Sequence, residues 1–68
     1  MLSDNEVKIK FDILSNKLQA GRFSEVITEA SLLLKKRPHQ VFFNILSIAY
    51  QSIGEFQKSY EIMETALK

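Results

Sequence analysis

A block of nine residues occurs twice in this chain. Residues 11–19 read FDILSNKLQ and residues 43–51 read FNILSIAYQ, so five of the nine positions are identical. After one additional residue in the second copy, the match resumes as Gly-x-Phe at residues 21–23 and 54–56. The offset is therefore 32 residues before that addition and 33 after it. A period of this length is typical of helical repeat proteins, whose unit is a helix-turn-helix.

Three residues divide the chain into segments of helical length, namely Gly21, Pro38 and Gly54. Within the segments, apolar residues recur every three or four positions, which is typical of a helix buried along one side. We therefore predict an all-α fold of two antiparallel helical hairpins, stacked side by side. The four predicted helices lie near residues 4–20, 23–37, 40–53 and 56–67.

Several residues are suited to beginning or ending these helices. Ser3 and Glu6 form a capping-box pattern before the first helix, and Ser24 is expected to cap the second. Pro38 cannot continue a helix, and it disfavours helical geometry at Arg37. The predicted ends therefore have local causes that are independent of the repeat.

The third segment, residues 40–53, is apolar nearly all round, so we expect other helices to cover it on several sides. The competing interpretation is a strand at Val41-Phe42-Phe43. The polar spacing of the segment and its lack of hairpin turn signals favour a helix.

The length and composition indicate one small domain that spans residues 1–68. A chain of 68 residues without cysteine has a marginal core, because neither a large buried interior nor disulfides can reinforce it. The net charge of +1 lacks the basic footprint of a nucleic-acid binder. The polar start is no signal peptide, and no apolar run approaches membrane-spanning length. We therefore expect a cytoplasmic protein that binds neither nucleic acid nor membranes.

The residues that carry chemistry in other proteins are scattered here. His39 is the only histidine, and the two glycines are 33 residues apart rather than in a phosphate-binding loop. Glu61 and Glu64 share a helix side without a histidine to complete a metal site. The cations at residues 35–37 fit the end of a helix, where they complement its dipole. We expect no catalytic residues, no cofactor and no metal.

The chain resembles the tetratricopeptide repeat family, whose unit is a helix-turn-helix of about 34 residues. The family pattern opens with a large aromatic residue, followed by leucine with a small residue after it, and then tyrosine. These positions hold Phe11, Leu14, Ser15 and Leu18 in the first copy and Phe43, Leu46, Ser47 and Tyr50 in the second. Serine replaces the family's glycine where two helices approach closely.

The rest of the family pattern is met in part. The turn aromatic is present as Phe23 and Phe56, and Pro38 matches the closing proline. In the second helix the family prefers a small, then a large, then a small residue. Ser59, Met63 and Ala66 fit this order, and Val26, Ala30 and Leu33 invert it. The resemblance implies a right-handed solenoid with repeat one at about 7–39 and repeat two at about 40–68. The alternative is a generic four-helix bundle with an accidental repeat.

The resemblance also implies a function, which is to bind a peptide or helix of a partner protein in a concave groove. The groove positions of the family correspond to Ile9, Asp12, Asn16, Gln19, Val41, Asn44, Ile48 and Gln51. Amide side chains at such positions can hydrogen-bond a peptide backbone. The alternative is that these are ordinary solvated positions. One subclass grips chaperone C-terminal carboxylates with a lysine where this chain has Asp12, so we do not expect that ligand.

We also expect self-association, because the last predicted helix presents apolar residues that no following helix covers. The predicted self-association face consists of Leu32, Tyr60, Met63 and Leu67, with Leu32 as a separate second site. The expected state is a homodimer, or an array with further repeats in a longer chain. The alternative is a monomer that hides these residues internally.

Two functions follow from the sequence. The first is a non-catalytic protein-interaction module. The second is the amino-terminal adaptor segment of a larger enzyme, such as a transferase.

Overall fold

The computed structural model describes residues 3–67, with side chains through residue 65. It contains four α-helices, which are α1 (Asp4–Gln19), α2 (Phe23–Lys36), α3 (Gln40–Ser52) and α4 (Phe56–Leu67). Each predicted helix is present, and each end falls within one residue of its predicted position. No strand occurs between residues 3 and 67, so Val41-Phe42-Phe43 is helical.

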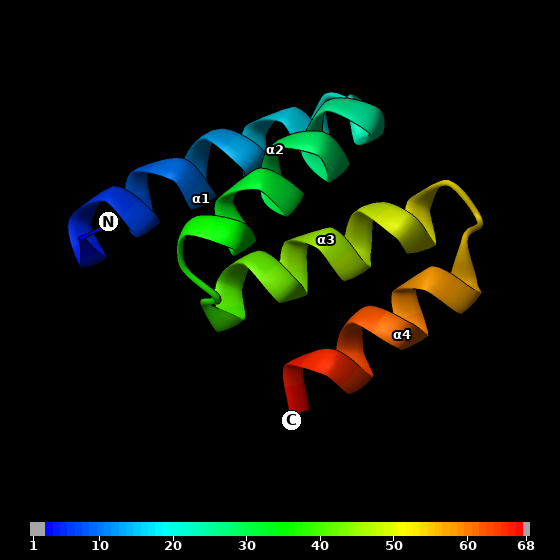
Figure 1. The fold of residues 1–68 in the computed structure, drawn as a ribbon. Coiled ribbons are helices and arrows are strands. Elements are labelled where there is room, and N and C mark those ends of the chain that lie inside the picture. Colours follow the sequence, from blue (N-terminus) through cyan, green and yellow to red (C-terminus); the bar gives the residue numbers. More distant parts are fainter. Residues whose placement is uncertain (1–2, 68) are drawn as a thin grey trace.

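The helices pack in the order in which they follow one another in the chain (Figure 1). Each helix lies against the one before it, and α3 also contacts α1. In a closed up-and-down bundle α1 and α4 would be neighbours, but here they do not touch. The molecule is correspondingly flat, with extents of 31 × 30 × 13 Å. The two hairpins therefore lie side by side instead of closing into a bundle.

The buried core is centred on α3, which contacts all three other helices. This explains why its sequence is apolar on nearly every side. The buried apolar side chains are Val7, Leu14, Val26, Ala30, Leu33, Phe42, Ile45, Leu46 and Ala49. Among the described side chains, α4 adds only the small polar Ser59 to the buried set.

Most of the predicted helix ends are confirmed. The Glu6 N–H donates to Ser3 Oγ at 3.2 Å and the capping box is complete. Arg37 has extended backbone geometry, as its position before Pro38 requires. The prediction for Ser24 is wrong, because α2 begins at Phe23 and its N-cap residue is Arg22, without a side-chain hydrogen bond.

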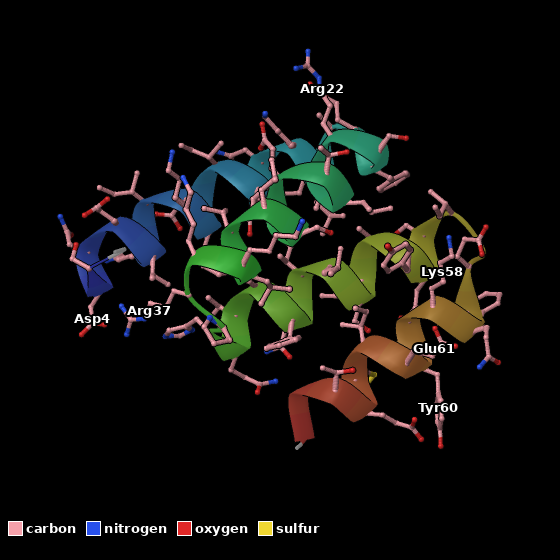
Figure 2. All side chains as sticks on the ribbon, in the orientation of Figure 1. Asp4, Arg22, Arg37, Lys58, Tyr60 and Glu61 are labelled. Atoms are coloured by element: carbon pink, nitrogen blue, oxygen red, sulfur yellow. The ribbon has the colours of Figure 1, made fainter. Side chains whose placement is uncertain are left out.

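The connection between the hairpins is held by two side chains. Arg37 Nη2 lies 2.6 Å from Asp4 Oδ1, so the end of α2 is paired with the start of α1 (Figure 2). His39 is the N-cap of α3, and its Nδ1 accepts the Val41 N–H at 3.2 Å. Both residues therefore have structural roles at this junction.

The two hairpin turns have the same geometry. Gly21 and Gly54 adopt φ values of 80° and 82°, the left-handed region that glycine enters at little cost. The N–H of Arg22 donates to the Lys17 carbonyl and that of Glu55 to the Tyr50 carbonyl, each at 2.9 Å. With the glycine N–H bonds of 3.1 Å, each turn is a Schellman motif that satisfies the helix end.

Candidate functional site

The eight predicted groove residues lie on α1 and α3, which pack side by side. Seven of them are exposed, and Val41 is half-buried against the core. Ile9 and Ile48 are 49% and 47% exposed, an unusual exposure for isoleucine, which most often lies inside. We call the surface formed by the eight residues the α1/α3 face.

The amide side chains on the α1/α3 face differ in how they are used. Gln51 Nε2 donates to Ser59 Oγ at 3.0 Å, so this amide is tied to α4. Asn44 Oδ1 accepts a hydrogen bond of 3.0 Å from its helix neighbour Gln40. Asn16 and Gln19 make no side-chain hydrogen bond within residues 3–65. The structure therefore leaves the α1 amides open to a ligand and commits Gln51 partly to the fold.

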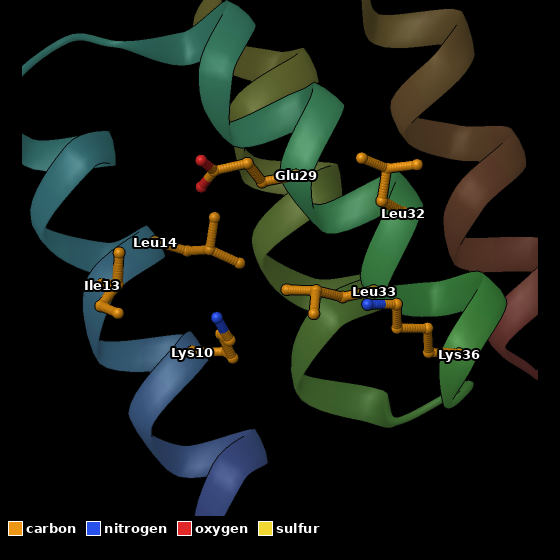
Figure 3. A pocket seen from close by; sticks show the side chains of 7 residues that line it. All are labelled: Lys10, Ile13, Leu14, Glu29, Leu32, Leu33 and Lys36. Atoms are coloured by element: carbon orange, nitrogen blue, oxygen red, sulfur yellow. The ribbon is translucent and has the colours of Figure 1, made fainter. Parts of the chain in front are cut away.

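A hollow of about 390 Å³ lies between α1 and α2, away from the predicted groove residues (Figure 3). None of those eight residues lines it. Its lining consists of Lys10, Ile13, Leu14, Glu29, Leu32, Leu33 and Lys36. Glu29 Oε1 pairs with Lys17 Nζ at 2.6 Å beside this α1–α2 hollow. The hollow has an apolar floor and a charged rim.

Sequence reasoning missed this hollow, although a signal was available. The repeat aligns Lys10 and Ile13 with Phe42 and Ile45, which are 0% and 2% exposed. In the second hairpin these positions are covered, and in the first they border open space. Where the second copy of the repeat has the buried Phe42, the first copy has Lys10. A charged residue at this position indicates that no helix covers this side of α1.

The predicted self-association face divides into two parts. Tyr60 and Met63 lie on α4 and are 61% and 53% exposed; Phe56, which was not part of the prediction, precedes them at helical spacing and is 68% exposed. We call these three residues the α4 stripe, and Figure 2 shows the Tyr60 side chain pointing away from the other helices. Leu32 lies apart, on the α1–α2 hollow. The Leu67 side chain lies outside the described residues.

A buried polar contact joins α3 to α4. The hydroxyls of Ser47 and Ser59 share a hydrogen bond of 2.7 Å, and Gln51 extends the contact. Every buried side-chain nitrogen or oxygen described in the structure has a partner. A satisfied cluster of this kind holds two helices together and offers no unpaired group to a substrate.

Groups suited to chemistry are not brought together in residues 3–65. Glu61 is approached by its neighbour Gln57 at 3.5 Å. No three histidine, cysteine, aspartate or glutamate side chains converge within that range. Among the described helices, none is both long and apolar enough to cross a bilayer. The surfaces of note are therefore the α1/α3 face, the α1–α2 hollow and the α4 stripe.

Comparison of the chain with protein-family models, curated proteins and solved structures found no match.

Proposed function

We propose that this chain is a non-catalytic protein-interaction module of tetratricopeptide type. Its ligand is an extended peptide or a helix of a partner protein, bound on the α1/α3 face. The relationship to the family rests on the internal repeat and on the sequential packing of two hairpins with matching turns. In this proposal the two hairpins form a short right-handed solenoid.

One observation carries the proposal for the α1/α3 face, which is the exposure of Ile9 and Ile48 on two adjacent helices. Apolar contacts from these residues would supply affinity, as buried apolar area does at protein interfaces. Asn16 and Gln19 lie on the same helix as Ile9 and can bond a peptide backbone through either their carbonyl or their amino group. The face is therefore suited to a peptide whose main chain, more than its charge, is recognised.

The experiment is co-purification from the native host with the wild-type chain and an Ile9→Glu, Ile48→Glu double variant. We expect a defined partner to be retained by the wild type and lost by the double variant, because a carboxylate cannot be buried unpaired at an interface. The matched control is Leu32→Glu, which alters an equally exposed residue on the α1–α2 hollow. A partner retained by all three proteins would contradict the proposal.

Self-association remains a prediction. Sedimentation equilibrium at micromolar concentration tests it, since a single-chain mass throughout the range would reject a homodimer.

A further inference from the structure

The α1–α2 hollow is apolar along its middle. Its floor is formed by Leu14 and Leu33, which are 1% and 8% exposed. Its sides are formed by Ile13 from α1 and Leu32 from α2, which are 42% and 54% exposed. None of these four side chains donates or accepts a hydrogen bond. The middle of the hollow therefore suits an alkyl group, whereas the polar main chain of a peptide would find no partner there.

The internal repeat does not account for the apolar side at Leu32. With the offset of 33 residues, Leu32 aligns with Thr65, which is exposed on α4. The fold therefore accepts an exposed polar residue at this position of the repeat. Leu32 and Ile13 are instead apolar side chains that face solvent from the two helices of one hollow. Both are available to contact a ligand.

The uncompensated charge of the hollow is positive and lies at one end. Lys10 from α1 and Lys36 from α2 border this end (Figure 3). Within residues 3–65, neither lysine has an ion-pair partner. Glu6, one turn before Lys10, is engaged in the capping box. Glu29 lies at the other end of the hollow, and its Oε1 is already paired with Lys17 Nζ at 2.6 Å. A ligand with one anionic end would complement this arrangement.

A helix stacked on α1 is a poor occupant of the hollow. The repeat aligns Lys10 with Phe42, which is buried where α3 packs among its neighbours. A helix that covered α1 in the same way would bury the Lys10 ammonium group, and burying a charge without a partner is strongly unfavourable. A small anion placed between Lys10 and Lys36 would instead pair with both charges and leave them accessible to water.

The dimensions of the hollow fit a small molecule. Its volume of about 390 Å³ lies within the range of roughly 300–1,000 Å³ that is typical of ligand pockets. Lys36 and Glu29 lie two helical turns apart on α2, a distance of about 10 Å along the helix axis. An extended alkyl chain of about ten carbons has this length, at about 1.2 Å per bond.

We propose that the α1–α2 hollow binds an amphipathic monoanion, namely a carboxylate with a straight alkyl tail of about ten carbons. The carboxylate lies between Lys10 and Lys36, and the tail lies on Leu14 and Leu33 toward Glu29. The tail displaces water from apolar side chains, and the head group forms charge-assisted hydrogen bonds with both lysines. No residue of this site belongs to the α1/α3 face, so the proposal goes beyond the function proposed above.

Three probes separate the head group from the tail. Decanoate has both, decylammonium has the same tail with the opposite charge, and acetate has the carboxylate alone. Each is titrated, below its micelle concentration, into the isotope-labelled full chain, and amide chemical shifts are followed by NMR. We expect decanoate to shift amides of α1 and α2 beside the hollow in a saturable way. Decylammonium should bind at least several-fold more weakly, and acetate should not saturate, because it has no tail to bury.

Substitutions test the role of the two lysines. The double variant Lys10→Glu, Lys36→Glu should weaken decanoate binding about tenfold or more and strengthen decylammonium binding, because the charge at the head-group end is reversed. The matched control is Lys8→Glu, Lys35→Glu, which changes the net charge equally at exposed residues of the same helices that do not line the hollow. It should alter decanoate binding less than about twofold. Circular dichroism confirms folding, and glutamine replaces glutamate in both pairs if a variant is unfolded.

Several outcomes would overturn the proposal. One is equal affinity for decanoate and decylammonium, which would remove the requirement for an anion. Another is an equal loss of decanoate binding in the lysine pair of the hollow and in the control pair, or no loss in either. Chemical shifts centred on the α4 stripe would place the alkyl tail on a different exposed apolar surface.

Two further results would assign the hollow to another occupant. The first is a two-chain mass of the free protein in sedimentation equilibrium that Leu32→Glu reduces to one chain, which would assign the hollow to a second copy. The second is co-sedimentation with phosphatidylglycerol vesicles, lost on substitution of Lys10 and Lys36, by a chain that does not bind decanoate. That result would assign the two lysines to a membrane surface.

Discussion

The two hairpins share their turns and their aromatic pattern, yet they are held together internally in different ways. In the first, Val26 is buried between the helices, and Lys17 pairs with Glu29 across them at 2.6 Å. In the second, the position of Val26 holds Ser59, which hydrogen-bonds Ser47 at 2.7 Å. The first hairpin thus has an apolar contact with an ion pair at its edge, and the second has a buried pair of hydroxyls at the equivalent place.

The repeated sequence determines the geometry of the two turns, whereas the neighbouring helices determine which side chains are buried. Both turns are Schellman motifs because glycine occupies the same place in each. Coverage, however, follows position in the stack, since Phe42 is fully buried while its counterpart Lys10 is exposed. Residues at equivalent positions of the repeat should therefore contribute differently to the free energy of unfolding. Substituting both members of an aligned pair measures the difference.

The largest difference is expected at Phe42 and Lys10. Phe42→Ala should destabilise the fold by about 3–5 kcal/mol, because it removes a buried aromatic side chain and leaves a cavity. Lys10→Ala should change the stability by less than about 0.5 kcal/mol, as surface substitutions usually do. Urea denaturation followed by circular dichroism measures both. Similar losses for the two variants would show that the hairpin ends are covered alike.

The next difference concerns Ala30 and Met63. Ala30→Met should cost about 1–3 kcal/mol, because a fully buried alanine leaves no room for a longer side chain. Met63→Ala should cost less than about 0.5 kcal/mol, because Met63 is half exposed. Thermal melts of the two single variants are compared at low protein concentration. A marked loss for Met63→Ala would mean that the α4 stripe is already covered in solution.

The turns should behave alike. Gly54→Val and Gly21→Val should each destabilise the fold by on the order of 1 kcal/mol or more, because a β-branched residue resists a left-handed backbone. Beyond the glycine and its two chain neighbours, no atom lies within 4 Å of where a Cβ would sit, so the cost comes from the backbone conformation. Asparagine, which tolerates this conformation better, should cost less at both sites. If valine at one of the two turns left the melting temperature unchanged, the two turns would not be equivalent.

The smallest expected effect is at the hydroxyl pair. Ser59→Ala removes two hydrogen bonds but should cost only about 1 kcal/mol, because Ser47 can then bond a carbonyl of its own helix and the exposed Gln51 amide can bond water. Ser52→Ala, on the exposed side of α3, is the control and should cost less than about 0.5 kcal/mol. Chemical denaturation with both proteins in parallel resolves this difference. Equal stability of the two variants would assign no net contribution to the buried pair.

The helices could be predicted closely because their ends have local causes. Gly21, Pro38 and Gly54 act on neighbouring residues alone, and the repeat fixes the register between hairpins. Ser24 misled because the turn makes Arg22 serve both the end of α1 and the start of α2. Glycine, proline and capping-box signals are therefore reliable where no second motif overlaps them.

The candidate surfaces could be predicted less completely, because they depend on contacts between helices. Ile9 and Ile48 are exposed, and their contact with a partner stays a prediction. The hydrogen bond from Gln51 to Ser59 joins two different helices. It forms only for particular side-chain rotamers, which the sequence pattern does not predict. The α1–α2 hollow depends on the distance between the two helices. That distance cannot be predicted from the spacing of apolar residues along the sequence.

The sequential packing of the helices also has a consequence for folding kinetics. Each helix finds its main partner next to it in the chain, across a connection of three residues. Short connections lose little entropy on closing, and chains dominated by local contacts fold in microseconds to milliseconds. Since α3 contacts every other helix and packs as extensively on α4 as on α2, we expect the nucleus to form around α3. Among the described side chains α4 has no buried apolar residue, so its amide protons should be the first to exchange.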